Sequence, residues 1–481
     1  MLAKTLHFIV IAIEVLAIFN LLIIVHELGH FLAARWRGLY IDEFGIWFGK
    51  PLWRKKIKGV WYSLGSIPAG GFVKLPQLAP MEAIEGESDM PREALAPITP
   101  LSKIIVALAG PVFSIGLAFV MATAVWIVGK PDNEIDSTTI GYVAKGGPAE
   151  QAGLKPGDEI LAVDGKKVVH FVSGTNSVKW AIIRSEGEKI AFRIKRGETI
   201  QTIESGWVKP KQANWRRPAL REVQIGPRIK PGVGFIEPKS PAEQAGLKVG
   251  DLITAINGEP VEDLEHVEPF ITGNPGQPLA LTVEREIEHK KQSLALTFIV
   301  PAAKPGDEKP GFDLGIGWGR TTLSHPYPWE QVSESATTIF RMVGALTSSK
   351  SDVKASHFSG PVGIMKLYYS VLDTDNGWRL ALGLSVLINV NLGLLNMLPF
   401  PVLDGGHIML ATLEIVRRKP VNIRVLEIVQ TACVVALIGF MLYVTFFDVG
   451  DSFGRKPKDA PKEEEKAAPP KSEPPAGEPQ K

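Results

Sequence analysis

The sequence has very little cysteine and almost no net charge, and each shortage excludes a class of protein. Cys433 is the single cysteine among 481 residues, so no disulfide can form within the chain and no set of thiolates can hold a metal ion. The formal net charge of +2 argues against nucleic acid as a partner. Extreme overall hydrophobicity is also missing, since the mean hydropathy is +0.10. Any membrane spans must therefore be accompanied by sizeable soluble parts.

Long apolar runs are nevertheless present, and each could cross a hydrocarbon core about 30 Å thick. We expect four transmembrane helices, over residues 6–34, 101–128, 380–399 and 427–447. The first run is too long for a cleavable signal peptide, so we expect it to be retained. Basic residues crowd the segments after the first and third runs. The positive-inside rule therefore places these two segments in the cytoplasm and residues 129–379 outside.

The first run contains a metal-binding pattern, His26-Glu27-Leu28-Gly29-His30. Histidines four residues apart lie on one face of a helix, where both imidazoles can reach one zinc ion and Glu27 can act as general base. Ionisable residues inside a membrane span are costly and usually functional. The alternative is a soluble core helix with two hydrogen-bonded histidines, which does not explain the apolar residues on both sides.

A zinc site of this kind needs a third protein ligand, and the end of the third run offers one. Asp404 follows a proline-rich turn and precedes Gly405 and Gly406, at the same predicted depth as the two histidines. We predict Asp404 as the third ligand and keep His407 as its competitor. Two amides of the same run, Asn391 and Asn396, must find partners in hydrocarbon; they either bond neighbouring helices or hold a substrate backbone.

The segment after the first run predicts β structure next to the metal site. Residues 41–48 and 60–74 are rich in aromatic and β-branched residues and are separated by glycine and proline. We expect a membrane-associated hairpin over 41–74 that either presents a strand edge to an extended substrate or only anchors the chain at the interface. The Gly110-Pro111 pair in the second run indicates close helix packing rather than chemistry.

An internal repeat occupies the outer part of the chain. The 14 residues from Gly147 recur from Ser240, and the Asp164-Gly165 turn recurs as Asn257-Gly258. Each copy resembles a PDZ domain of the type associated with bacterial proteases, which implies two small β-sandwiches able to bind an extended peptide by strand addition. The alternative is a pair of rigid spacers or a size filter that binds no ligand.

These features define the expected architecture, a polytopic α-helical membrane protein with two PDZ-like domains inserted between the second and third transmembrane helices. The expected parts are a first membrane part (1–128), PDZ domains (129–228 and 229–302), a linker with amphipathic helices (303–378), a second membrane part (379–450) and a disordered tail (451–481).

In combination, the two motifs, the glycine-rich strand and the PDZ repeats resemble the site-2 family of intramembrane zinc metalloproteases. The resemblance is strongest to the bacterial branch that regulates sigma factors. It implies one zinc ion per chain held by His26, His30 and Asp404, with Glu27 as the catalytic base. It also implies substrate contacts through residues of the third run and of the strand, namely Asn391, Asn396, Gly70, Gly71, Phe72 and Val73. Ser114 departs from the family pattern, where asparagine is expected, and this puts a helix-packing contact in doubt.

The resemblance further implies a substrate and a location. The substrate would be a single-pass membrane protein such as an anti-sigma factor, cut after an earlier trimming cleavage, with its C-terminus or outer domain meeting the PDZ pair. The enzyme would lie in the lipid bilayer of the bacterial inner membrane, with periplasmic PDZ domains and an active site towards the cytoplasm. Two other functions remain open: a PDZ-bearing membrane scaffold with a structural zinc and no proteolysis, and a metal transporter, which would need polar residues spread through its spans.

Overall fold

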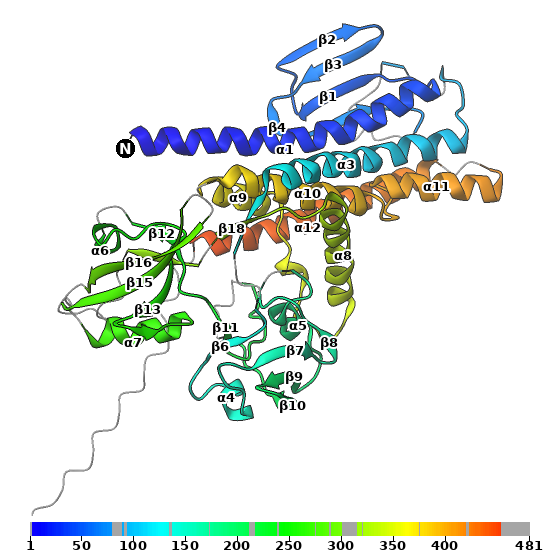
Figure 1. Cartoon of the computed structure of the whole chain (residues 1–481). Coiled ribbons are helices and arrows are strands. Elements are labelled where there is room, and N and C mark those ends of the chain that lie inside the picture. Colours follow the sequence, from blue (N-terminus) through cyan, green and yellow to red (C-terminus); the bar gives the residue numbers. More distant parts are fainter. Residues whose placement is uncertain are drawn as a thin grey trace, which may run out of the picture.

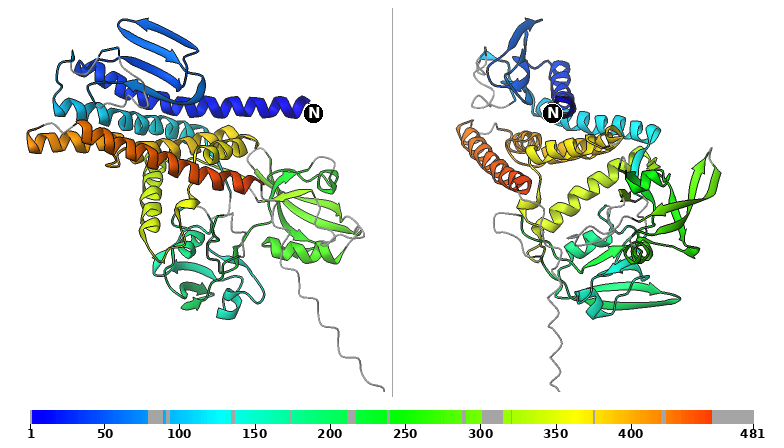
Figure 2. Two further views of the ribbon diagram at one scale, coloured as in Figure 1. Left: turned by 180° about the vertical axis from the view of Figure 1, so that it is seen from behind. Right: turned by 90° about the vertical axis from the view of Figure 1, so that its left-hand side faces the viewer.

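The structure is a computed structural model. It describes residues 2–78, 89–90, 94–133, 137–172, 174–210, 217–237, 240–274, 276–287, 290–300, 315–319, 321–374, 376–419 and 423–453. Nearly all of the predicted tail and parts of the predicted linkers at 76–100 and 303–378 lie outside these residues. A layer of long helices carries one sheet on one side and two smaller modules on the other, as Figures 1 and 2 show from three directions.

Four helices of the described chain are long and apolar enough to cross a membrane, judged by length and composition. They are α1 (Leu2–Arg37), α3 (Pro100–Val128), α10 (Gly377–Asn396) and α12 (Ile423–Phe453). The four apolar runs are therefore confirmed as helices. The third helix ends at Asn396 instead of residue 399, because Pro399 and Pro401 follow and proline disfavours helical conformation before it.

Helix α3 packs against both α1 and α10, and glycines make the close approach possible. A Cβ atom on Gly29 of α1 would lie 2.5 Å from the Ala109 carbonyl oxygen of α3. A Cβ atom on Gly393 of α10 would lie 3.2 Å from the Pro111 carbonyl oxygen. Small residues at such positions allow helix backbones to meet where lipid provides no hydrophobic driving force.

The segment predicted as a hairpin is a four-stranded sheet, so this prediction was wrong in detail. Its strands are β1 (Glu43–Phe48), β2 (Trp53–Ile57), β3 (Val60–Leu64) and β4 (Ile67–Lys74), in the order β2-β3-β1-β4. Strands β1 and β3 are parallel, whereas β1 and β4 are antiparallel. The sheet lies beside α1, with β4 as the edge strand nearest to the helix (Figure 1).

The sequence repeat folds twice into the same arrangement. The first module contains β6 (Ile140–Val143), α4 (Pro148–Ala152), β7 (Glu159–Val163), β8 (Lys166–Lys167), α5 (Val178–Arg184), β9 (Ile190–Arg196), β10 (Thr199–Ser205) and β11 (Ile225–Pro227). The second contains β12 (Val233–Ile236), α6 (Pro241–Gln244), β13 (Leu252–Ile256), β14 (Glu259–Pro260), α7 (Leu264–Gly273), β15 (Pro278–Ile287), β16 (Lys290–Ile299) and β17 (Ile316–Trp318). The first sheet has the strand order β10-β9-β7-β8, and the second, read from its other edge, has the order β16-β15-β13-β14. The two sheets therefore correspond strand for strand.

Equivalent ion pairs stabilise both modules. Arg196 Nε lies 2.6 Å from Asp158 Oδ1, and Arg285 Nε lies 2.6 Å from Asp251 Oδ1. Each arginine also donates to a carbonyl oxygen at the end of the short helix in its module. Because β17 pairs with β12, residues 316–318 complete the second module from beyond its predicted end at 302.

Several elements connect the modules to the helices. Strands β5 (Lys130–Asn133) and β18 (Thr321–Ser324) pair where the chain leaves α3 and approaches α8 (Pro328–Thr347). The short η2 (Ala355–His357) and α9 (Pro361–Leu372) then lead to α10, and α11 (Asp404–Arg417) follows it. Arg221 and Lys209 of the first module both form ion pairs with Asp352, which lies between α8 and η2.

Candidate metal centre

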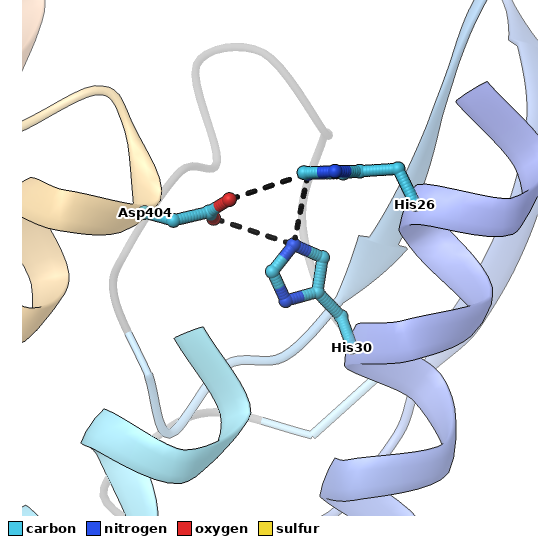
Figure 3. A group of neighbouring side chains, drawn as sticks. All are labelled: His26, His30 and Asp404. Carbon is cyan, nitrogen blue, oxygen red and sulfur yellow. Dashed lines mark hydrogen bonds and ion pairs between the residues drawn. The ribbon is translucent and has the colours of Figure 1, made fainter. Parts of the chain in front are cut away.

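Three side chains from two distant helices converge at one point, and they are the three predicted as metal ligands (Figure 3). His26 and His30 lie one turn apart in α1, and Asp404 is the first residue of α11. His26 Nε2 lies 3.2 Å from Asp404 Oδ2, and His30 Nε2 lies 3.3 Å from Asp404 Oδ1. The two Nε2 atoms are 3.3 Å apart. We call this group, in which the Asp404 carboxylate presents a different oxygen to each of two neighbouring imidazole nitrogens, the triangle.

This triangle fits a zinc ion. Zinc bonds of about 2.0–2.1 Å in tetrahedral geometry place neighbouring ligand atoms about 3.3–3.4 Å apart, close to the observed separations. Asp404 Oδ2 is buried and makes no hydrogen bond within the described residues, as expected for an oxygen that coordinates a cation. Two imidazoles and one carboxylate also leave the fourth position open, which is the arrangement of catalytic zinc sites.

Helix α3 orients both imidazoles although it contributes no ligand. His30 Nδ1 lies 2.8 Å from the Val106 carbonyl oxygen, and His26 Nδ1 lies 2.9 Å from Ser114 Oγ. With Nδ1 engaged, Nε2 of each ring faces the metal position. Gly110, which lies between Val106 and Ser114 on α3, leaves room for the two rings, since a Cβ atom there would lie 2.2 Å from His30 Nε2.

Glu27 and the edge strand β4 meet beside the triangle. The Glu27 carboxylate accepts a hydrogen bond from the backbone N–H of Val73, and a Cβ atom on Gly71 would lie 3.4 Å from Glu27 Cγ. Glu27, Gly71, Phe72 and Val73 line one cavity of about 250 Å³ together with the three predicted ligands. The cavity is therefore bounded by a general-base candidate on one side and an edge strand on another.

The open edge of β4 faces away from the rest of its sheet. The carbonyls of Asp42 and Ile46 accept hydrogen bonds from the β3 side. The backbone groups of the odd-numbered residues of β1 therefore face β4, where Gly45 lies opposite Phe72. Because backbone groups alternate along an antiparallel pair, those of Gly71 and Val73 point outwards. Apart from the Val73 N–H, which already donates to Glu27, these groups could pair with an added strand.

The structure brings some of the remaining predicted residues to the cavity and leaves others outside it. Asn396 lines the cavity, and its Nδ2 lies 3.3 Å from His26 Nε2. His407, one turn after Asp404, also lines the cavity. It does not belong to the described cluster of three possible metal ligands, whose donor atoms all lie within 4.8 Å of one another. Asn391 is not among the cavity-lining residues, and neither is Gly70, which lies within β4 with a φ of +79°.

Sequence reasoning missed the roles of Ser114 and Gly110. Ser114 was noted only as a departure affecting helix packing, and Gly110 only as a packing residue. Both are 80 or more residues from the histidines in sequence. The spacing of Val106, Gly110 and Ser114 at intervals of four, which places them on one face of a helix, was a usable signal.

The chain is similar to known proteins along most of its length. The family model described as Peptidase family M50 matches residues 14–440. Protease RseP of Yersinia pestis is 30% identical over 456 residues, covering 89% of this chain and 96% of that protein. The Regulator of sigma-E protease RseP of Escherichia coli K12 is 29% identical over 458 residues, with the same two coverages. A Neisseria meningitidis protein provisionally named a zinc metalloprotease is 30% identical over 451 residues, covering 90% of this chain and 97% of its own.

Among solved structures, the PDZ domain of the SdrC-like protein of Listeria monocytogenes matches a small part of the chain. It covers 19% of this chain and 86% of that one, at 21% identity and a TM-score of 0.15.

Proposed function

Because the chain belongs to peptidase family M50 and is a zinc metalloprotease, we propose that it hydrolyses peptide bonds within or next to the transmembrane segments of single-pass membrane proteins. The observation that carries this proposal is the triangle of His26, His30 and Asp404. Its two histidines lie on a helix that is long and apolar enough to cross a membrane. Glu27 lies on the same helix, between the two histidines. A substrate reaching this site would approach from within or beside the bilayer.

The residues around the triangle have distinct roles in this reaction. One zinc ion per chain, held by His26, His30 and Asp404, would lower the pKa of water and polarise the scissile carbonyl. Glu27 accepts a proton from the attacking water and passes it to the leaving amine. The Val73 N–H holds the Glu27 carboxylate at the cavity, and the amide of Asn396 is placed to hold a substrate backbone group.

A helical substrate must be unwound before it can be cut, because its peptide groups are engaged in i to i−4 hydrogen bonds. We assign this step to the open edge of β4. The outward N–H and carbonyl of Gly71 and the carbonyl of Val73 can replace the lost helical hydrogen bonds by strand addition. Phe72 lies between them and lines the same cavity.

We further propose that the two repeat modules are PDZ-like domains that admit only substrates trimmed by an earlier cut. Support comes from their common topology and from their insertion between α3 and α10. The basic segments after α1 and α11 favour an inner-membrane orientation with the modules outside and the active site towards the cytoplasm. Two relatives are named RseP, one of them as a regulator of sigma E, so an anti-sigma factor is the substrate class to test first.

The first experiment tests proteolysis itself. Purified protein in lipid nanodiscs is given a single-pass substrate with a short outer stub, and cleavage is followed for wild type, Glu27→Gln and wild type with a zinc chelator. Glu14→Gln is the matched control, because Glu14 is an exposed carboxylate of the same helix. We expect cleavage only by wild type and the Glu14 variant. Cleavage that survives Glu27→Gln would refute the assigned base, and zinc binding without cleavage of any substrate would favour the scaffold.

A deletion tests the filter. Removing residues 137–319 takes out both modules while keeping the β5–β18 pair, in which Asn133 lies opposite Thr321, so a short linker can join the two strands. This variant is expected to cleave an untrimmed substrate that wild type refuses. If it cuts trimmed substrate normally and still refuses the untrimmed one, the filter is refuted.

A further inference from the structure

Asn20 of α1 lies outside the metal site, and its side chain forms two hydrogen bonds. Asn20 lies seven residues before Glu27, which is two helical turns, so both lie on the same side of the helix. Its Oδ1 accepts a hydrogen bond of 2.5 Å from Trp47 Nε1, and its Nδ2 donates to the Leu16 carbonyl oxygen at 2.6 Å. An amide inside an apolar span needs such partners. Here one partner comes from the sheet.

The backbone at Trp47, which makes this contact, is strained. Trp47 has a φ of +68°, in the left-handed region that bulky residues avoid, and it lies in the irregularity between Ile46 and Phe48 where the β1–β4 register shifts. Strain of this kind persists only where the surroundings enforce it, and it concentrates at functional sites. The irregularity directs the indole of Trp47 to α1.

The residue after Trp47 connects the irregularity to the cavity. Phe48 stacks on Phe72 with ring centroids 5.8 Å apart and planes inclined by 16°, and both rings line the cavity. Gly70 and Gly45 leave room for these rings, since a Cβ atom would lie 2.1 Å from the Phe48 ring or 2.3 Å from the Phe72 ring. A change at Trp47 would therefore be transmitted to the wall of the site.

The sheet is thus attached to α1 at two polar contacts, two turns apart: Trp47 to Asn20, and the Val73 N–H to Glu27. Phe31 of α1 also packs on Phe44 and Tyr62 of the sheet, but apolar contacts are not directional, whereas the two polar contacts fix the direction of β4. We propose that Asn20 and Trp47 are a positioning pair that holds the open edge of β4 alongside Glu27, in register for an incoming substrate strand. This proposal rests on the proposed function of the β4 edge.

The test removes the hydrogen bond from either end. Asn20→Leu removes the acceptor, Trp47→Phe removes the donor while keeping an aromatic ring, and Asn20→Gln keeps an uncharged amide. Loss of one hydrogen bond of about 1 kcal/mol corresponds to roughly a fivefold change in an equilibrium. We expect the first two variants to raise KM for a helical transmembrane substrate about fivefold with kcat nearly unchanged. The double variant should be no worse than either single one, and Asn20→Gln should be closer to wild type than Asn20→Leu.

A geometric readout separates positioning from general destabilisation. In a Glu27→Gln background with Cys433→Ala, Ile67→Cys places the single thiol on β4, where Ile67 is exposed. We expect disulfide formation with a cysteine in the substrate segment, weakened about fivefold by Asn20→Leu and less by Asn20→Gln. Thr123→Val is the matched control, because its hydroxyl bonds only to Phe119 of its own helix among the described residues.

Two outcomes would overturn the pair's role. One is unchanged KM and crosslinking in Asn20→Leu and Trp47→Phe. The other is a loss of zinc content or melting temperature that accounts for the whole effect. Either result would leave the proteolysis test with Glu27→Gln unaffected, so failure of the positioning pair is distinguishable from failure of the proposed function.

Discussion

Replacing Ser114 by alanine would show how far metal affinity depends on the orientation of His26. Ser114 is fully buried, and its Oγ lies 2.9 Å from His26 Nδ1. Alanine removes this partner without changing charge or leaving a large void. Removing the hydrogen-bond partner of a metal-binding histidine typically costs 10–100-fold in metal affinity, or about 1.4–2.7 kcal/mol. The lower bound agrees with the net value of one hydrogen bond, and the upper bound with a buried imidazole N–H left unsatisfied.

The assay is a zinc titration of the metal-free protein in nanodiscs against a competing chromophoric chelator. We expect Ser114→Ala to bind zinc 10–100-fold more weakly and to regain most of its cleavage rate at saturating zinc, because all three ligands and Glu27 remain. Ser385→Ala is the matched control: Ser385 is a buried serine of α10 whose hydroxyl bonds to Tyr368. Unchanged zinc affinity in Ser114→Ala, or an equal loss in Ser385→Ala, would refute the reasoning.

Three further predictions concern the space around the ligands, the strand edge and the attachment of the first module. Gly110→Ala places a Cβ atom 2.2 Å from His30 Nε2 and should abolish zinc binding, whereas Gly116→Ala of the same helix meets nothing within 4 Å and should bind zinc normally; zinc content checks both. Gly71→Pro removes an outward N–H of β4 and should lose cleavage while retaining zinc, whereas Gly71→Ala keeps the N–H and most of the activity; full activity of the proline variant would exclude strand addition. Burial alone would raise the pKa of Asp352, but hydrogen bonds and charges from its arginine and lysine partners outweigh burial and hold it below its usual value. Because the folded-state pKa is below the unfolded one, this contact stabilises the protein above about pH 4 and the stabilisation is lost as the pH falls through the folded-state value. The melting temperature of Asp352→Asn should therefore show a smaller loss than wild type between pH 5 and pH 3, and parallel curves would contradict this.

The parts of the molecule that could be predicted are those determined by local periodicity. The spacing of His26 and His30 is a property of one helix, and the apolar runs are long enough to identify their helices without tertiary information. The repeat was visible because its turns, such as Asp164-Gly165, need residues that accept positive φ; Asp164 has a φ of +48° and Asn257 of +52°. Asp404 was assigned through its expected depth, and the structure places its carboxylate beside both histidines.

The sheet next to α1 shows where such reasoning fails. Neighbouring segments such as 41–48 and 60–74 suggest an antiparallel hairpin, yet β1 pairs in parallel with β3 and leaves β4 as the edge nearest to the helix. The intervening β2, Trp53–Ile57, is exposed throughout and lacks the alternation that marks a half-buried strand, so no local pattern indicated it. The choice is made by tertiary contacts, including Trp47 with Asn20 and Val73 with Glu27.

Helix α3 shows why a motif of ligands is an incomplete description of this site. It supplies no metal ligand, yet Val106, Gly110 and Ser114 on one of its faces orient one imidazole, make room for both rings and orient the other. Its backbone carbonyls also contact the glycines at which α1 and α10 approach it most closely. In lipid, apolar burial does not drive helices together, so convergence of ligands from α1 and α11 has to come from such close backbone contacts and hydrogen bonds. The metal position is therefore defined by a helix that an inspection of His, Asp and Glu residues would pass over, and substitutions on that one face of α3 should affect zinc binding more than substitutions of other buried residues in the spans.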